Sequence, residues 1–361
     1  MSSRKASRVF TLGVLAGVFV MACSGGTPST AVTDAPSAAP SSAVVTAEPG
    51  TLPQPEMAEL QIASSSNEIS DFAIRLAIAR GIFEKYGIKA EYSIFEGDAL
   101  VSNALQGGQI QFASLGTSSS FSSHLTDTPY DIVAVTADRL TDALVCKSGI
   151  DTAEEVKGKS IAISTFGGTS NAAALLSLKA LGLGADAAVI TQVGGQSARI
   201  AALQGGSIDC AIIDSVLNDQ MSSEGFAIAT DLSKVDVPFG RSGVAALEDF
   251  IKSNPNTVLV TVAAILEGQN EIWKDPDGAA EAYSKDTGIS LEDAKTQVED
   301  FHDVGDRSLM WPDEALLNAQ KPIAIVNPDV IEVQPADVGD HTFLQKLVDI
   351  GFYEKIGSPV S

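Results

Sequence analysis

A ten-residue pattern occurs twice in this chain of 361 residues. Residues 104–113 read ALQGGQIQFA, and residues 202–211 read ALQGGSIDCA. In each copy, apolar residues at helical spacing end at a Gly-Gly pair, where glycine can adopt the left-handed conformation that ends a helix. A strand-like alternation comes next, and a polar loop follows it. Each copy therefore predicts a helix, a strand and a polar loop at the carboxyl end of that strand.

Further strand and helix signals surround both copies of the pattern. Around the first copy we expect strands at 59–63, 90–94, 110–115, 132–136 and 143–146, with helices at 70–86 and 99–106. Around the second we expect strands at 160–164, 189–193 and 208–213, with helices at 172–181 and 197–204. This alternation predicts an α/β fold of two lobes, each a mostly parallel sheet flanked by helices. Ligands bind outside the carboxyl ends of strands in open α/β sheets, so the polar loops predict a cleft between the lobes.

The chain beyond residue 256 is mainly helical in pattern. Helices are expected at 257–272, 276–285 and 341–354, and Ser290 is placed to cap another helix. Few strand signals remain for a third α/β domain, so these helices should pack on the first lobe. We accordingly divide the folded chain into a first lobe at 58–147, a second lobe at 148–243 and a return to the first lobe at 244–361. Two strands should cross between the lobes, near 143–150 and 240–246.

The first residues have the pattern of an export signal. Arg4, Lys5 and Arg8 precede an apolar run at residues 9–22, which is shorter than the ~20 residues that a membrane-spanning helix needs. The run ends in Val20-Met21-Ala22-Cys23, which resembles a bacterial lipobox with valine in place of the commoner leucine. We expect residues 1–22 to be a signal peptide and Cys23 to carry a diacylglycerol. An uncleaved anchor helix and a plain signal peptide are the alternatives.

The segment that follows Cys23 is rich in Ser, Thr, Ala, Pro and Gly and has almost no large apolar residues. Such a composition cannot bury enough surface to become ordered. We therefore interpret residues 23–57 as a lipidated, disordered tether that holds a folded domain off the membrane.

Charge and composition exclude some classes of function. The chain has 23 Lys and Arg residues against 46 Asp and Glu residues. This acidic balance argues against nucleic-acid binding, which needs a basic surface. Cys146 and Cys210 lie in apolar, strand-like runs. They could form a disulfide, but the sequence does not show whether they are close, and we expect two buried free thiols.

The sequence offers no pattern for catalysis. It has no G-x-S-x-G, P-loop, H-E-x-x-H or C-x-x-C motif. Its three histidines, His124, His302 and His341, are scattered and show no metal-ligand spacing. We therefore expect a binding protein with neither a metal nor a cofactor, not an enzyme.

Several motifs in the expected order resemble a known family. Residues 77–88 read AIARGIFEKYGI, and residues 156–163 read VKGKSIAI and are followed by Gly167-Gly168-Thr169-Ser170. Together with the two ALQGG segments, they resemble the solute-binding proteins of bacterial ABC importers. The resemblance is to the NMT1-like branch that includes binders of thiamine pyrimidines, sulfonates, nitrate and riboflavin, and it covers roughly residues 58–300. Eukaryotic thiamine-pyrimidine synthases resemble this family too, but their dense cysteine cluster is absent here.

The resemblance implies a type II periplasmic-binding-protein fold and a location outside the cytoplasm. It also implies a protein that binds a small molecule and delivers it to a permease powered by an ATPase subunit. We expect the protein to be a monomer. A ligand that contacts both lobes would favour closure of the cleft, because the open state lacks those contacts. A receptor that feeds a sensor protein is an alternative role.

The candidate ligand-binding residues lie in loops at strand ends. They are Ser65, Ser66, Asn67, Gly116, Thr117, Ser118, Arg139, Phe166, Gly168, Thr169, Ser170, Asn171 and Asp214. A polar residue in such a loop is often only a helix cap, and Asp214 could be one. Arg139 could instead pair with Asp138 or Asp142, and Phe166 could pack in a core or stack on a ligand ring.

The chemistry of these residues bears on the ligand. A sulfonate or nitrate site needs arginine or several N–H donors and no nearby carboxylate. The candidate set has one arginine and one aspartate, so it favours a neutral, vitamin-like heterocycle. We expect a pyrimidine precursor of thiamine or riboflavin, with a sulfonate such as taurine, or nitrate, as the alternative.

Overall fold

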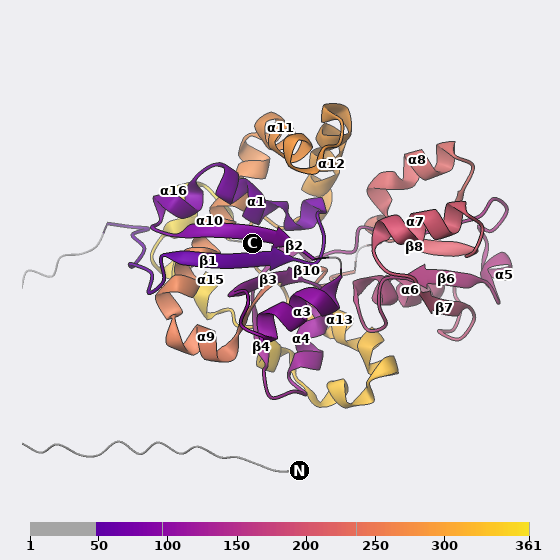
Figure 1. Cartoon of the computed structure of the whole chain (residues 1–361), viewed down its shortest axis with the longest axis horizontal. Helices are drawn as coiled ribbons and strands as arrows, with labels where there is room; N and C mark the ends of the chain where they lie inside the picture. Colours follow the sequence, from indigo (N-terminus) through magenta and orange to yellow (C-terminus); the bar gives the residue numbers. More distant parts are fainter. Residues whose placement is uncertain (1–47, 96, 236, 361) are drawn as a thin grey trace, which may run out of the picture. The chain divides into compact units, whose positions relative to one another are not determined.

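The computed structural model describes residues 48–95, 97–235 and 237–360. The proposed signal peptide and Cys23 lie outside these residues, as does most of the proposed tether. Strands of the described part form two five-stranded sheets, here called sheet A and sheet B (Figure 1). Within the described ranges, no helix is both long and apolar enough to span a bilayer.

Sheet A has the strand order β2-β1-β3-β10-β4. Its strands are β1 (Glu59–Ser64), β2 (Lys89–Ile94), β3 (Phe112–Leu115), β4 (Tyr130–Ala137) and β10 (Ser242–Leu247). β1 pairs in parallel with β2 and β3, whereas β10 is antiparallel to both β3 and β4. The sheet is therefore mixed, and its one antiparallel strand comes from late in the chain.

Sheet B has the order β7-β6-β8-β5-β9. Its strands are β5 (Asp142–Cys146), β6 (Ser160–Ile163), β7 (Val189–Gln192), β8 (Cys210–Asp214) and β9 (Ala227–Asp231). β6 pairs in parallel with β7 and β8, and β5 is antiparallel to β8 and β9. The α/β class and the two sheets predicted from the sequence are confirmed.

The position of β5 differs from the prediction. We assigned this strand to the first lobe, but it pairs only within sheet B. The chain thus crosses from sheet A to sheet B between Ala137 and Asp142 and returns between Asp231 and Ser242. A strand signal in the sequence reports extended backbone and says nothing of which sheet receives the strand, which explains the error.

The repeated pattern has the predicted structure in both sheets. Helix α3 (Asp98–Gln106) leads to β3, and helix α7 (Gln196–Gln204) leads to β8. The second glycine of each pair, Gly108 and Gly206, has φ of 69° and 74°, in the left-handed region that glycine tolerates. β3 and β8 are the central strands of their sheets, so each copy delivers its loop to the middle of a sheet edge.

The remaining helices surround the two sheets. The longer ones are α1 (Phe72–Ala79), α6 (Thr169–Ala180), α10 (Pro255–Lys274), α11 (Pro276–Thr287), α12 (Leu291–Val304), α13 (Asp313–Val326) and α15 (Thr342–Asp349). The short ones are α2 (Ile82–Lys85), α4 (Ser118–Ser123), α5 (Ala153–Val156), α8 (Asn218–Ser223), α9 (Glu248–Ser253), α14 (Pro335–Val338) and α16 (Phe352–Ile356). The described residues also form four 3-10 helices: η1 (Ile69–Asp71), η2 (Ser215–Leu217), η3 (Leu232–Lys234) and η4 (Pro328–Glu332). The helix expected at 70–86 is interrupted at Gly81, whose φ is 67°.

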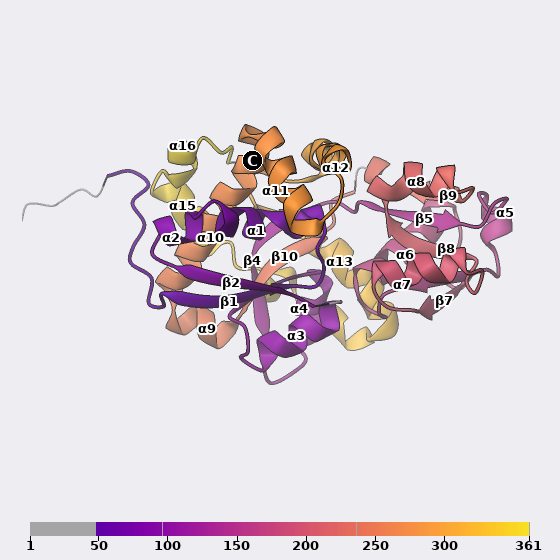
Figure 2. The same cartoon turned by 45° about the horizontal axis from the view of Figure 1, so that its top comes forward.

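Three apolar cores hold the described residues together. The largest joins sheet A to the carboxyl-terminal helices, with Val258, Val262 and Leu266 of α10 in the same cluster as Leu76 of α1. Two smaller cores cover the faces of sheet B. Figure 2 shows α1 and α10 beside sheet A and α7 and α8 beside sheet B. The tail helices pack on sheet A as expected, except that α13 also contacts α6 and places Ala319 in a core of sheet B.

Cys146 and Cys210 form a disulfide with an S–S distance of 2.03 Å. The two residues lie opposite each other in the antiparallel pair β5 and β8, and both are fully buried. Our expectation of two free thiols was wrong. The pairing depends on the insertion of β5 beside β8, which the spacing of the cysteines in the sequence does not reveal.

Candidate ligand-binding site

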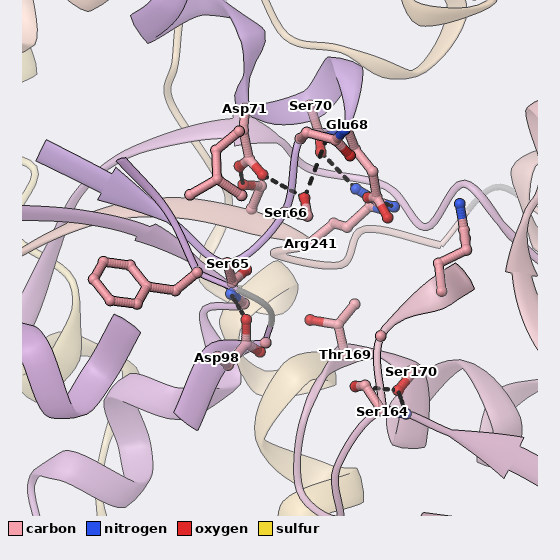
Figure 3. A pocket seen from close by; sticks show the side chains of 18 of the residues that line it. Ser65, Ser66, Glu68, Ser70, Asp71, Asp98, Ser164, Thr169, Ser170 and Arg241 are labelled. Atoms are coloured by element: carbon pink, nitrogen blue, oxygen red, sulfur yellow. Dashed lines mark hydrogen bonds and ion pairs between the residues drawn. The ribbon is translucent and has the colours of Figure 1, made fainter. Parts of the chain in front are cut away.

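A cavity of about 290 Å³ lies at the carboxyl ends of the parallel strands of both sheets (Figure 3). Loops after β1, β2 and β3 line it from sheet A, and loops after β6 and β7 line it from sheet B. Asp142 and Arg241, at the two crossings between the sheets, also line it. The predicted cleft therefore exists, and its volume is near the lower end of the roughly 300–1,000 Å³ typical of small-molecule sites.

Asp71 organises the sheet A side of the cavity. Its Oδ1 accepts hydrogen bonds from the hydroxyls of Ser114 at 2.7 Å and Ser242 at 2.5 Å, and its Oδ2 accepts from Ser66 at 2.7 Å. These serines come from the loop after β1, from β3 and from β10. One buried carboxylate thus fixes three chain segments at the edge of the cavity.

Arg241 links the two sheets. Its Nη1 donates to Ser70 at 2.6 Å, and its Nη2 lies 2.5 Å from an oxygen of Glu68, both in the segment that follows β1. From sheet B, Asp214 lies 3.3 Å from Nη2 and Asp142 lies 3.5 Å from Nε. A single buried guanidinium therefore faces three carboxylates, one from the sheet A side and two from sheet B.

Burial and charge shift the pKa values of this cluster in different directions. Burial raises the pKa of Asp214 to about 7, because the attraction of Arg241 does not fully offset the loss of water. Burial also raises the pKa of Asp142. Burial alone would raise the pKa of Glu68 as well. The charge attraction and the hydrogen bond between Glu68 and Arg241 outweigh burial, so the pKa of Glu68 is lowered.

A second arginine, Arg199 of α7, faces the cavity from the sheet B side. Its Nε donates to the carbonyl of Ile212 at 2.7 Å, and its Nη1 donates to that of Gly194 at 2.9 Å. Burial lowers the pKa of Arg199. Backbone carbonyls therefore already occupy part of the N–H donors of Arg199, whereas carboxylates occupy donors of Arg241. Among the described lining residues, Glu68, Asp71, Asp98 and Asp142 outnumber these two cations.

The loops of the two sheets touch at one end of the cavity. A methyl group placed on Gly116, which follows β3, would collide with the Thr169 hydroxyl at the start of α6 and lie 2.8 Å from Oδ2 of Asp98. Oδ1 of Asp98 accepts from the Gly116 amide at 3.3 Å, and burial raises the pKa of Asp98. Glycine at position 116 therefore permits the close approach of the two loops.

Beside this contact, Ser170 of α6 holds the end of β6. Its hydroxyl accepts a hydrogen bond from the Ser164 amide at 2.8 Å and lies 2.7 Å from the Ser164 hydroxyl. Both serines line the cavity, so the first turn of α6 presents hydroxyl groups to it (Figure 3).

Six of the thirteen predicted residues line this cavity: Ser65, Ser66, Asn67, Gly116, Thr169 and Ser170. Phe166 and Gly168 line a neighbouring cavity of about 290 Å³, which Asp98 also lines. Arg139 lines neither of these two cavities. Its side chain is 41% exposed and lies 4.0 Å from Asp138, the surface pairing that we considered as its alternative.

The other four predicted residues make contacts within the protein. The buried Thr117 hydroxyl donates to the Gly240 carbonyl at 2.5 Å, and Ser118 is buried in α4. Oδ1 of Asn171 accepts from the Gly167 amide at 3.0 Å, which shapes the turn before α6. Asp214 caps η2 by accepting from the Val216 amide at 3.2 Å, in addition to its pairing with Arg241. Asp214 is not among the residues that line the cavity, but it contacts Arg241, which is.

Sequence reasoning missed every charged residue that lines the cavity: Glu68, Asp71, Asp98, Asp142, Arg199 and Arg241. Glu68 and Asp71 could have been found, since they follow Ser65-Ser66-Asn67 directly in the loop after β1. Arg199 lies within a helix and Arg241 at a crossing, so no local pattern distinguishes either of them.

The chain matches known proteins over most of its length. The family model described as NMT1/THI5 like matches residues 71–279. A riboflavin-binding protein, RibY of Chloroflexus aurantiacus, is 28% identical over 279 residues, which are 75% of this chain and 76% of that protein.

Solved structures show the same fold. A protein from Bordetella bronchiseptica superimposes with a TM-score of 0.72 at 21% identity, over 84% of this chain and 100% of that one. The periplasmic nitrate-binding protein NrtA of Synechocystis PCC 6803 superimposes with a TM-score of 0.67 at 14% identity, over 86% of this chain and 93% of that one. With its two mixed sheets, this chain has the periplasmic-binding-protein fold. It belongs to the NMT1/THI5-like family.

Proposed function

We propose that the protein is the extracytoplasmic solute-binding lipoprotein of an ABC importer and that its ligand is a neutral heterocycle, with riboflavin preferred over a pyrimidine precursor of thiamine. The charge of the cavity carries the proposal. Four carboxyl groups line it, and both of its arginines donate to protein oxygens. An anion would have to displace those partners and approach the carboxylates, which is unfavourable in a buried site.

A flavin fits the distribution of polar groups. Its ring system has an N–H donor and carbonyl acceptors, which suit the carboxyl groups and hydroxyls of the cavity, and Phe95 offers an aromatic surface at the rim. The neighbouring cavity shares Asp98 and is lined by many hydroxyl and amide side chains, among them Ser102, Asn103 and Ser122. A polyol chain such as the ribityl group could extend there. The similarity to RibY supports the same ligand.

Anion binding is the competing proposal, since NrtA has the same fold. Isothermal titration against riboflavin, flavin mononucleotide, an aminopyrimidine, taurine and nitrate separates the two. We expect riboflavin to bind and its phosphorylated form to bind at least about tenfold more weakly, because the phosphate adds negative charge near Asp98. Binding of taurine or nitrate alone would reject the proposal.

Export and anchoring are supported by the lipobox-like sequence at Cys23 and by the disulfide. Disulfides persist in oxidising compartments outside the cytoplasm. Replacing Cys23 with serine should release the protein from the membrane fraction without changing its ligand affinity.

The permease and ATPase are proposed partners that would read the closed form of the two lobes. A receptor role, in which a sensor protein reads that form instead, is the alternative. Loss of riboflavin uptake on deletion of the gene would support transport.

A further inference from the structure

Three side chains that could hold a metal ion lie together away from the ligand cavity. They are His124, Asp131 and Glu248, and their nearest ligating atoms all lie within 4.8 Å of one another. Nε2 of His124 already lies 2.9 Å from Oδ1 of Asp131. None of the three lines the ligand cavity. Only His124 and Asp131 are near each other in the sequence, and Glu248 is far from both. The sequence therefore showed no metal-ligand spacing around His124.

The fold brings these residues to one edge of sheet A. His124 follows the last turn of α4, Asp131 is the second residue of β4, and Glu248 begins α9 directly after β10. β10 also carries Ser242 of the ligand cavity at its other end. The strand has six residues. At about 3.4 Å per residue it separates the two sites by roughly 20 Å.

The backbone of this cluster is held in place. Asp131 pairs with Ala246 in the ladder between β4 and β10, and the Glu248 amide donates to the Pro129 carbonyl at 3.2 Å. The His124 amide donates to the Ser120 carbonyl at 3.2 Å. On this fixed backbone, side-chain rotations have to bring the three ligand atoms to about 2.0–2.2 Å from a shared zinc ion.

Exposure and charge allow an ion to enter. The side chains of His124, Asp131 and Glu248 are 11%, 18% and 29% exposed, so the site is partly shielded but reachable. Asp340 lies near enough to interact electrostatically with Asp131, so it adds negative charge beside the three residues. Lys252 forms an ion pair with Glu248 and would compete with a metal ion for that carboxylate. The Lys252 side chain is 66% exposed, so breaking this pair costs little.

From these observations we propose that His124, Asp131 and Glu248 form a zinc site, with water completing the coordination. One imidazole and two carboxylates suit Zn²⁺, whereas Mg²⁺ and Ca²⁺ prefer sites made only of oxygen. The site is separate from the proposed ligand cavity, so this proposal does not depend on which solute the protein binds.

The test is isothermal titration of ZnCl₂ into the purified, metal-stripped full chain. We expect one Zn²⁺ per chain and no comparable heat from MgCl₂. His124→Gln should weaken zinc binding at least about tenfold, since even indirect partners of metal ligands are worth about 10–100-fold. Glu248→Gln should weaken it too. His302→Gln is the matched control, because His302 stacks on Trp273 instead and should leave zinc binding unchanged.

Thermal unfolding of each metal-free variant separates loss of a ligand from loss of the fold. Zinc binding that survives in both His124→Gln and Glu248→Gln, or no zinc binding by a folded native chain, would overturn the proposal. Riboflavin titration of the same variants gives an independent check, because neither substitution should change the flavin affinity.

Discussion

Sheet A and sheet B have the same arrangement of strands but are stabilised differently. In each sheet, one strand (β1 or β6) lies between two parallel neighbours, and an antiparallel strand (β10 or β5) pairs with the strand of the repeat. Sheet A shares one large core with the carboxyl-terminal helices. Sheet B has two smaller cores and a disulfide between β5 and β8. The smaller lobe thus compensates for a smaller core with a covalent link.

The lobes also differ in what they bring to the cavity. The sheet A side contributes three carboxyl groups, Glu68, Asp71 and Asp98, whereas sheet B contributes only Asp142 to the lining, together with Arg199 and the hydroxyl-bearing start of α6. Arg241, at the return crossing, touches carboxylates from both sides. The comparison teaches that a duplicated unit supplies the shape of the cleft, whereas its charged residues all lie outside the repeated ten-residue pattern.

Removing the link between the lobes should have the largest effect. Arg241→Ala leaves Glu68, Asp142 and Asp214 buried without their cation, and loss of one partner from a buried ion pair costs about 3–5 kcal/mol. Urea denaturation would measure this loss in the free energy of unfolding. Arg139→Ala is the control, since that arginine is 41% exposed and its change should stay within about 1 kcal/mol. Equal losses in both variants would mean that Arg241 is not the link.

The disulfide tests the difference between the sheets directly. Cys146 and Cys210 are 64 residues apart, and closing a loop of that size stabilises a fold by about 4 kcal/mol in the chain-entropy model. The double variant Cys146→Ala/Cys210→Ala should therefore lose about 2–4 kcal/mol. Hydrogen exchange should show the loss in β5, β6 and β8 and little change in β1 and β3. Uniform loss of protection across both sheets would contradict independent cores.

The third prediction concerns pH, and its effect over a single pH unit is smaller than either loss above. The pKa of Asp214 is about 7 in the folded chain, against an ordinary value near 3.9 when unfolded. Between about pH 4 and pH 7 the folded state therefore holds a proton that the unfolded state has released. This contribution to stability falls as pH rises through that window, by at most about 1.4 kcal/mol per pH unit, and levels off above it.

Asp214→Asn should remove this contribution but leave those of its neighbours. The raised pKa of Asp142 acts in the same direction as that of Asp214, and the lowered pKa of Glu68 stabilises the fold as pH rises. Urea denaturation of both proteins from pH 4 to pH 8 would give the difference. If the two curves stay parallel, Asp214 does not titrate in this range. Ser118→Ala, a buried hydroxyl position outside the cluster, serves as the control with no expected change in slope.

The sequence alone determined the α/β class, the two helix-strand-loop repeats and the resemblance to the family. Local spacing suffices for these, because the period of apolar residues and the glycines at 108 and 206 act over a few residues of chain. The hydroxyl-bearing part of the cavity was also predicted, since Ser65, Ser66, Thr169 and Ser170 directly follow strands or begin a helix.

Only the tertiary structure decided which sheet received β5 and β10. The placement of β5 in sheet B and of β10 in sheet A produces three features. They are the disulfide between Cys146 and Cys210, the charge cluster around Arg241, and the proximity of His124 and Asp131 to Glu248. Each of these depends on contacts between segments far apart in the chain. The physical reason is that strand pairing between distant segments is set by how the whole chain buries its apolar surface, and no short stretch of sequence encodes it.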